Sequence, residues 1–314
     1  MPLDLRVKRF LDVLAAGHPA TLSDATVEQR RRGLADLMKF AGPDTPIGAV
    51  EDRLVPRPGS PLMVRMYAPL DATGASLPGL VYFHGGGLVA GSVATHDSIA
   101  RALTHFGGCR VISVDYRLAP EHPFPAAIDD ALHAVAHIGA NAAEFGIDAA
   151  RLGVCGDSAG ATLAAVVSQA PAHPGLAKNP PLALQVLICP ILDYTRLTQS
   201  KRDFARGYLV DQATLDHDLR HYVPDGVHPS DPRISPLCAS ALSRVPRTLI
   251  HTAEFDPLRD EGRDYFERLS RAAADVSYTC HPGMIHLFYG LGGVIPYART
   301  ALEQIGREIR AAWA

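Results

Sequence analysis

The order of apolar and polar positions divides the chain into a helical start, a hairpin and a longer series of strands and helices. In residues 1–45, apolar side chains recur at helical spacing without any strand-like run, and Thr21 and Ser23 are candidate caps for the second helix. From residue 48 to 68, two short alternating runs, AVEDRLVP and LMVRMYAP, flank the turn sequence RPGS. This pattern predicts an antiparallel hairpin.

Beyond the hairpin, short continuous apolar runs alternate with helical segments. Runs of this kind predict strands that are buried on both faces of a sheet. They occupy residues 79–84, 109–116, 151–155, 182–189, 247–252 and 276–280. Helical spacing is found between most of them, for example at 124–138, and again in the last segment of the chain. The alternation predicts an α/β fold with a mostly parallel central sheet, right-handed crossovers and helices on both faces.

One long interval interrupts this alternation. Between Asp193 and Pro236 the chain is rich in charges, lacks a buried-strand run and is too long for an ordinary loop. We interpret it as a helical insertion that packs with the N-terminal helices to form a cap over the sheet. The predicted organisation is N-terminal cap helices at 1–45, a first catalytic part at 46–193, the cap insertion at 194–230 and a second catalytic part at 231–314.

Composition narrows the class of protein. With 314 residues and 47% hydrophobic content, the chain fits one α/β domain with an added subdomain. The net charge is -3 and no run of five like charges occurs, which argues against a nucleic-acid partner; the cluster from Arg30 to Arg32 is interpreted as a solvated helix face. No apolar stretch reaches the length of a membrane span, and charges within the first residues argue against a signal peptide.

The cysteines bear on the compartment. There are five of them, an odd and widely spaced set: Cys109, Cys155, Cys189, Cys238 and Cys280. They predict buried free thiols in a reducing, cytoplasmic compartment rather than disulfides or metal ligands. No motif decides the oligomeric state, and a homodimer stays open.

Candidate chemistry is expected directly after the strands, because ligands of open parallel sheets bind beyond the carboxyl ends of the strands. After the run at 151–155 comes GDSAG, which matches the nucleophile elbow with Ser158 at its centre. Gly156 and Gly160 are needed there because a Cβ at either position would meet neighbouring backbone. The alternative is a tight turn of small residues that has no catalytic role. The Asp157 carboxylate could either cap the following helix or brace the elbow, and the sequence does not decide between these roles.

The run at 79–84 is followed by three glycines, Gly85, Gly86 and Gly87. Glycines after a strand leave backbone N–H groups uncovered, and such donors can stabilise an oxyanion. A Gly triplet by itself is also typical of a flexible loop. Its place about 70 residues before the elbow is the one that the hydrolase pattern requires.

The last two strands are followed by candidate acids and bases. Glu254, Asp256 and Asp260 follow the run at 247–252; Asp256 precedes a proline, which favours an extended loop, whereas Asp260, with Glu261, is interpreted as the solvated first turn of a helix. His281 and His286 follow the run at 276–280. We favour His286 because it lies beyond Gly283 on a loop that can bend back towards the serine, in the chain order Ser, Asp, His.

With these motifs assembled, the chain resembles the hormone-sensitive-lipase family of α/β-hydrolases, which includes bacterial carboxylesterases and lipolytic enzymes. The resemblance spans residues 79 to about 290. It rests on HGGG at 84–87, DYRLAPEHPFPAA at 115–127, GDSAG at 156–160, DPLRDEG at 256–262 and GMIH at 283–286. The N-terminal helices and the insertion match the family's cap by position only.

The resemblance implies roles for individual residues. Ser158 would be the nucleophile, His286 the general base and then acid, and Asp256 the partner that orients His286. The oxyanion donors would be the backbone N–H groups of Gly86, Gly87 and Ala159.

Other residues of the shared motifs have structural roles by the same resemblance, or depart from it. His84 would hold the glycine loop, and Asp115 and Glu121 would be loop and packing residues. Leu88 stands where an aromatic residue is usual and Leu287 where glycine is common. Both departures are expected near the acyl or alcohol pocket and therefore bear on substrate preference.

The expected function is hydrolysis of small, moderately apolar esters with short acyl chains through an acyl-enzyme, without a metal or organic cofactor. The expected partner is a small-molecule ester. An amidase or acyltransferase with the same triad is one alternative. A non-catalytic ligand-binding protein is another, since the plant gibberellin receptor resembles this family but has lost the catalytic histidine. Five cap residues could contact an acyl chain or fill the cap's own core: Phe10, Leu14, Phe204, Tyr208 and Leu209.

Overall fold

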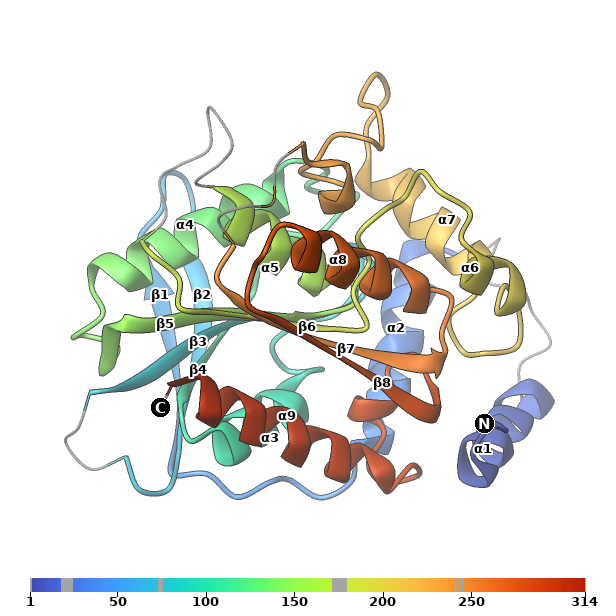
Figure 1. Ribbon diagram of the computed structural model, residues 1–314, viewed down its shortest axis with the longest axis horizontal. Helices are drawn as coiled ribbons and strands as arrows, with labels where there is room; N and C mark the ends of the chain where they lie inside the picture. The colour runs from blue at the N-terminus through green and yellow to red at the C-terminus, as the bar shows by residue number, and fades with distance from the viewer. Residues whose placement is uncertain are drawn as a thin grey trace.

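The computed structural model describes residues 2–17, 25–72, 76–170, 180–240, 242 and 245–313. A single eight-stranded sheet runs through the molecule in the order β1-β2-β4-β3-β5-β6-β7-β8 (Figure 1). The strands are β1 (Ala49–Val55), β2 (Leu62–Ala68), β3 (Leu77–Phe83), β4 (Arg110–Val114), β5 (Ile147–Asp157), β6 (Leu184–Ile188), β7 (Arg247–Phe255) and β8 (Val276–Ile285). The predicted hairpin is confirmed, since β1 pairs antiparallel with β2. The β2–β4 pair is also antiparallel, and the pairs from β4 through β8 are parallel, as the α/β pattern predicts.

Helices cover both faces of the sheet (Figure 1). On one face lie α4 (Ala126–Ala140), α5 (Ala159–Gln169) and α8 (Arg259–Arg271), and on the other lie α3 (Asp97–Gly107) and α9 (Tyr297–Trp313). The strands separate two apolar cores: Val81 and Phe83 of β3 belong to the first, and Leu80 and Tyr82 of the same strand to the second. Successive side chains of a strand point to opposite faces, so a strand covered on both sides must be apolar throughout.

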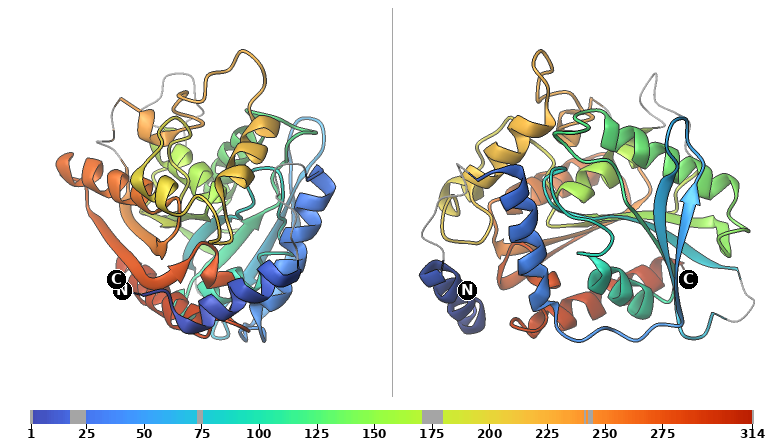
Figure 2. Two further views of the ribbon diagram at one scale, coloured as in Figure 1. Left: turned by 90° about the vertical axis from the view of Figure 1, so that its right-hand side faces the viewer. Right: turned by 180° about the vertical axis from the view of Figure 1, so that it is seen from behind.

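Four helices lie together at one side of the molecule, α1 (Leu5–Gly17), α2 (Val27–Met38), α6 (Gln199–Asp203) and α7 (Gln212–Tyr222). Figure 2 shows α2 beside α7, and Arg30 of α2 forms an ion pair with Asp218 of α7. The second N-terminal helix and the insertion are thus in contact, while the assignment of a cap and its boundaries stays a prediction. Short 3-10 turns follow at η2 (Lys39–Ala41), η4 (Pro236–Cys238) and η5 (Phe288–Gly290).

The N-cap residue of the second helix, α2, is neither of the two residues that the sequence suggested. Thr21 and Ser23 lie outside the described residues. The N-cap of α2 is Thr26, whose side chain accepts from the backbone N–H of Gln29 while the Gln29 side chain accepts from the Thr26 N–H. This reciprocal pair is a capping box, which satisfies two N–H groups at the helix start.

Of two surface assignments from the sequence, one is only partly right and the other is wrong. In the cluster from Arg30 to Arg32, Arg32 is solvated as expected, but Arg30 pairs with the buried Asp218, and the partly exposed Arg31 binds Glu121 and the backbone oxygen of Val89. The expected solvated turn at Asp260 and Glu261 is wrong, since Glu261 is fully buried and Asp260 is 8% exposed. Arg30 and Glu261 have charged partners distant in the chain, which the local sequence pattern does not reveal.

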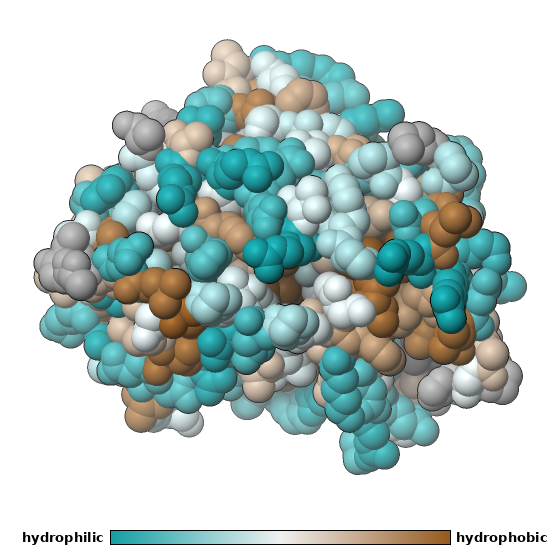
Figure 3. Space-filling model, turned by 90° about the horizontal axis from the view of Figure 1, so that it is seen from below, coloured by the Kyte–Doolittle hydropathy of each residue, from teal (hydrophilic) through white to brown (hydrophobic). Residues whose placement is uncertain are grey.

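On the face seen from below, hydrophobic residues of the described part of the chain form separate patches among hydrophilic ones (Figure 3). The exposed large apolar side chains include Leu5, Val13, Leu54, Leu70 and Leu197. Among the described helices, none has both the length and the apolar composition needed to cross a membrane.

Candidate active site

Ser158 stands at the sharp turn between β5 and α5. Its backbone has φ 52° and ψ -120°, a conformation that non-glycine residues rarely adopt and that is typical of functional turns. A Cβ on Gly156 would lie 2.2 Å from the Gly160 carbonyl oxygen, and one on Gly160 would lie 2.0 Å from that of Phe83. Both glycines are therefore required sterically, as the motif suggests.

Each of the three expected triad residues directly follows a strand. The last two strands are longer than the apolar runs predicted: β7 continues to Phe255 and β8 to Ile285. Asp256 and His286 are therefore the first residues after these strands. The β5 strand ends at Asp157, immediately before Ser158. Because these strands are parallel neighbours through β6, their carboxyl ends bring the three side chains to the same edge of the sheet.

The three side chains form a continuous chain of hydrogen bonds. His286 Nε2 lies 3.0 Å from Ser158 Oγ, and His286 Nδ1 lies 2.8 Å from Asp256 Oδ2. The other Asp256 oxygen accepts from the Leu258 N–H at 2.8 Å. With Nδ1–H donating to the carboxylate, Nε2 is left as an acceptor for the serine hydroxyl proton. The arrangement can activate Ser158 as a nucleophile.

The other candidate base and acids, His281, Glu254 and Asp260, have hydrogen-bond partners away from Ser158. His281 Nε2 is 3.2 Å from His251 Nδ1, and His281 Nδ1 is 3.2 Å from the Tyr297 hydroxyl. Burial, together with the neighbouring His251, lowers the pKa of His281 to about 3. Glu254 accepts from the Gly283 N–H, and Asp260 accepts from the Ser200 N–H. None of these contacts involves Ser158.

The glycine loop after β3 lies against the elbow. Gly86 and Gly87 have φ values of 121° and 69°, which side chains rarely allow. Among the described residues, no oxygen accepts a hydrogen bond from the backbone N–H groups of Gly86, Gly87 or Ala159. Ala159 is the first residue of α5, where helix N–H groups have no partner within the helix. These three donors are free to bind an oxyanion.

His84 holds the start of this loop. Its Nδ1–H donates to the Gly85 carbonyl at 2.8 Å, and its ring stacks on Tyr116, whose hydroxyl donates to the His84 carbonyl at 2.6 Å. Burial lowers the pKa of His84 to about 3, with a further contribution from His96. His84 is therefore a neutral structural residue.

Asp157, whose purpose the sequence left open, braces the glycine loop. Its carboxylate is fully buried and accepts from the hydroxyl of Tyr82, from the Gly85 N–H at 3.0 Å and from the Tyr289 hydroxyl at 3.0 Å. Burial by itself would raise the pKa of Asp157, but His96, Tyr82 and His84 outweigh burial and hold that pKa below its usual value. The ionised carboxylate thus links the elbow to the first glycine of the loop.

We expect Asp157→Asn to lower kcat about tenfold and to reduce the free energy of unfolding by about 1 to 2 kcal/mol, because the amide keeps one acceptor but loses the charge and the second acceptor. Steady-state ester hydrolysis and denaturant titration measure both effects. Asp148→Asn is the matched control, since Asp148 lies at the other end of β5 in a partly exposed pair with Arg151. Equal behaviour of the two variants would contradict the bracing role.

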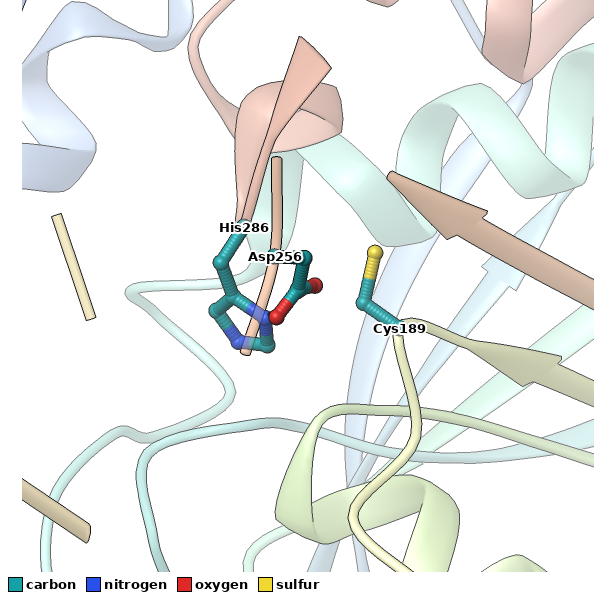
Figure 4. Close-up of side chains that lie close together, drawn as sticks. All are labelled: Cys189, Asp256 and His286. Carbon is teal, nitrogen blue, oxygen red and sulfur yellow. Dashed lines mark hydrogen bonds and ion pairs between the residues drawn. The ribbon is translucent and has the colours of Figure 1, made fainter. Parts of the chain in front are cut away.

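Cys189 is a neighbour of the triad that the sequence did not single out. Figure 4 shows its sulfur beside the Asp256 carboxylate, and atoms of Cys189, Asp256 and His286 all lie within 4.8 Å of one another. Burial, together with Asp256, raises the pKa of the Cys189 thiol well above its usual value, so it is a neutral thiol. In the described part of the chain this is the one cluster with metal-ligand character, and two of its members are already engaged with Ser158 or with each other. In the sequence, Cys189 is the last residue of the apolar run at 182–189, and only the structure shows that it directly follows β6.

A small cavity with a volume of ≈ 20 Å³ lies between α7 and the residues after β6 and β7. Its lining is partly polar and partly apolar: Ile191, Tyr194, Lys201, Gln212, Leu215, Asp216, Leu219 and Leu258. Ile191 donates its N–H to the Ser158 carbonyl, and Leu258 donates to Asp256, so the cavity adjoins the triad. Leu215 and Leu219 come from α7 of the cap.

Most of the cap residues considered for acyl contact pack against other side chains. Phe204 and Tyr208 form an aromatic cluster with Phe255, and Phe10 meets Phe40 edge to face. The remaining two, Leu14 and Leu209, are partly buried against the same core. Leu88 and Leu287, the two departures from the family pattern, are both buried.

The fold and the motifs match known hydrolases. A family model described as the alpha/beta hydrolase fold matches residues 80–290. The chain belongs to the hormone-sensitive-lipase family of α/β-hydrolases. It is 37% identical to carboxylesterase NlhH of Mycobacterium tuberculosis over 98% of this chain and 95% of that protein. It is 38% identical to ethyl acetate hydrolase of Pseudomonas putida, over 80% of this chain and 79% of that one.

A solved structure is equally similar. An ester hydrolase from the metagenome of Lake Arreo, in complex with a bipyridine phosphonate derivative, is 39% identical, with a TM-score of 0.94 over 99% of both chains. With such relatives this member of the α/β-hydrolases is an ester hydrolase.

Proposed function

We propose that this ester hydrolase is a serine carboxylesterase that cleaves small, moderately apolar esters with short acyl chains through an acyl-enzyme. The observation that carries the proposal is the hydrogen-bonded chain from Ser158 through His286 to Asp256, beside the free N–H groups of the glycine loop. Nucleophile, base and oxyanion donors are the three parts that acyl transfer requires.

In the acylation step, His286 Nε2 takes the Ser158 proton as Oγ attacks the ester carbonyl carbon. The carbonyl π electrons move to oxygen, and the N–H groups of Gly86, Gly87 and Ala159 bind the resulting oxyanion; each such donor is typically worth about 3 to 4 kcal/mol of transition-state stabilisation. When the oxyanion collapses, the bond to the alcohol oxygen breaks. The protonated His286 gives its proton to the leaving alcohol.

Deacylation repeats the sequence with water. His286 takes a proton from the water as its oxygen attacks the acyl carbon, and then returns a proton to Ser158 Oγ as the acid leaves. Asp256 keeps its negative charge throughout and stabilises the imidazolium at Nδ1.

The similarity to an ethyl acetate hydrolase of Pseudomonas putida supports a short acyl group. The cavity between α7 and the residues after β6 and β7, at ≈ 20 Å³, is the size of about one water molecule, so it is not itself the acyl pocket.

A series of p-nitrophenyl esters of increasing acyl length tests the substrate class. We expect kcat/KM to be highest for acyl chains of about two to six carbons and to fall beyond, because each poorly accommodated methylene costs about 1 kcal/mol or more. The matching p-nitroanilides tell an esterase from an amidase. A maximum beyond about ten carbons would contradict the short-chain proposal, and faster anilide than ester cleavage would favour an amidase.

A further inference from the structure

A buried ion pair of the cap lies directly over the glycine loop. Arg30 Nε and Nη2 donate to the two oxygens of Asp218 at 3.2 and 2.8 Å. The side chains are only 13% and 5% exposed. His217 Nδ1 lies 3.1 Å from Asp218 Oδ1, and its Nε2 lies 3.0 Å from the Ala25 carbonyl. Fork-shaped arginine–carboxylate pairs of this kind are geometrically specific and, when buried, are expensive to break.

The Asp218 carboxylate is in contact with one of the oxyanion donors. A Cβ built on Gly87 would lie 1.9 Å from Asp218 Oδ2, so the carboxylate occupies the space where a side chain of residue 87 would stand. Without its partner, this negative charge would face a site whose chemistry creates a second negative charge. An uncompensated carboxylate so close would repel the oxyanion and compete for the Gly87 N–H.

The neighbouring arginine attaches the same helix to the other end of the loop. Arg31 donates to the carbonyls of Val89 and Ala119 and makes two hydrogen bonds to Glu121. The loop around Gly87 therefore lies between α2 and α7, where Arg31 binds the loop and Arg30, the preceding residue of α2, binds Asp218 of α7.

We propose that Arg30 is a positioning residue for ester hydrolysis, which keeps the negative charge of the Asp218 carboxylate paired where that carboxylate lies against the Gly87 donor. The inference rests on the proposed function, since it assumes that the Gly87 N–H binds the oxyanion. It assigns a catalytic consequence to a contact between the N-terminal helices and the insertion, which would otherwise be read as cap packing.

The test is a double-mutant cycle of Arg30→Met and Asp218→Asn with p-nitrophenyl acetate, in which kcat and KM are measured separately. We expect Arg30→Met to lower kcat at least about tenfold with little change in KM, because the unpaired charge acts on the transition state. Asp218→Asn should stay within about threefold of wild type. The double variant should recover to within about threefold of Asp218→Asn, because the charge that needed a partner is gone.

Two further variants keep the outcome decisive. Arg32→Met on the same helix removes an exposed pair with Glu28 and should leave kcat unchanged. Arg30→Lys keeps the charge without the fork and should retain most of the wild-type kcat, so it serves where Arg30→Met does not fold. Thermal unfolding of every variant separates loss of fold from loss of turnover.

Any one of three results would overturn the role of Arg30: a kcat of Arg30→Met equal to that of Arg32→Met, a double variant as impaired as Arg30→Met alone, or a kcat of Arg30→Lys as low as that of Arg30→Met. If the wild-type enzyme itself fails to hydrolyse esters, the proposed function is wrong. If the wild type hydrolyses esters but the kcat values of the variants do not follow the expected order, only the inference about Arg30 is wrong and the proposed function stands.

Discussion

Ser158→Ala is expected to lower kcat for ester hydrolysis between about 10⁴- and 10⁶-fold, because the acyl-enzyme cannot form without the nucleophile. The fold should persist, since alanine at the elbow adopts the same backbone with φ 52° and only the hydrogen bond to His286 is lost. Chromogenic ester hydrolysis measures the loss, and circular dichroism checks the fold. A phosphonate ester adds a second readout: its covalent mass shift should fall on Ser158 in the wild type and vanish in the variant.

A second serine of the same helix provides the control. Ser168 is buried in α5 and lies away from the triad contacts, so Ser168→Ala should keep both turnover and labelling. Near wild-type turnover of Ser158→Ala would remove the assignment of the nucleophile. An active wild type that no phosphonate labels would also contradict an activated serine, whereas a protein with neither activity nor labelling would support the non-catalytic binding alternative.

Lys201→Met is expected to reduce the free energy of unfolding by about 3 to 5 kcal/mol, the typical cost of breaking a buried ion pair from one side. Lys201 Nζ lies 2.6 Å from Glu261 Oε1 and donates to the Asp193 carbonyl at 2.7 Å. Glu261 is fully buried, and its other oxygen accepts from two backbone N–H groups of the segment after β6. The pair thereby anchors the beginning of the cap insertion to α8.

The loss of unfolding free energy in Lys201→Met should depend on pH. Burial raises the pKa of Glu261 above its ordinary value of 4.5, although Lys201 acts to lower it. Without Lys201 the folded protein binds a proton at Glu261 that the unfolded chain releases above about pH 4.5. Because the native state then holds more protons, its stability falls as pH rises, by up to about 1.4 kcal/mol per pH unit.

Denaturant titrations at about pH 5 and about pH 8 measure this dependence, and the variant should be less destabilised at the lower value. Adding Glu261→Gln to Lys201→Met should recover part of the stability, because no charge is left buried. Lys8→Met, which breaks an exposed pair with Asp12, should change stability by less than about 1 kcal/mol. A loss at Lys201 no larger than at Lys8 would show that the buried pair does not anchor the insertion.

The sequence predicted the elbow because most of its constraints are local. The conformation at Ser158 and the narrow space at Gly156 follow from a strand that turns at once into a helix, so a five-residue motif contains them. The space at Gly160 is narrow for a different reason, because the carbonyl of Phe83 in β3 lies against it. The apolar runs likewise predicted the strands, because a strand covered on both faces has few alternatives to apolar side chains. The motif order then placed acid and base candidates after the last two strands.

The sequence favoured His286 over His281, but the reason it gave, a loop beyond Gly283, is wrong. Residues up to Ile285 continue β8, and this continuation places His281 beside His251 and Tyr297 and puts His286 against Ser158. Strand ends depend on pairing with β7, which joins residues far apart in the chain.

The sequence by itself determined the α/β architecture, the elbow, the glycine loop and the small set of residues from which a triad could be built, because backbone sterics and apolar periodicity act over a few residues. Only the tertiary structure decided what Asp157, Arg30 and Glu261 do. In the sequence each is a charge with no visible partner, and a charged residue is by default solvated. Their partners Gly85, Asp218 and Lys201 lie 72, 188 and 60 positions away, and the free energy of burying a charge depends on such partners rather than on its neighbours in the chain.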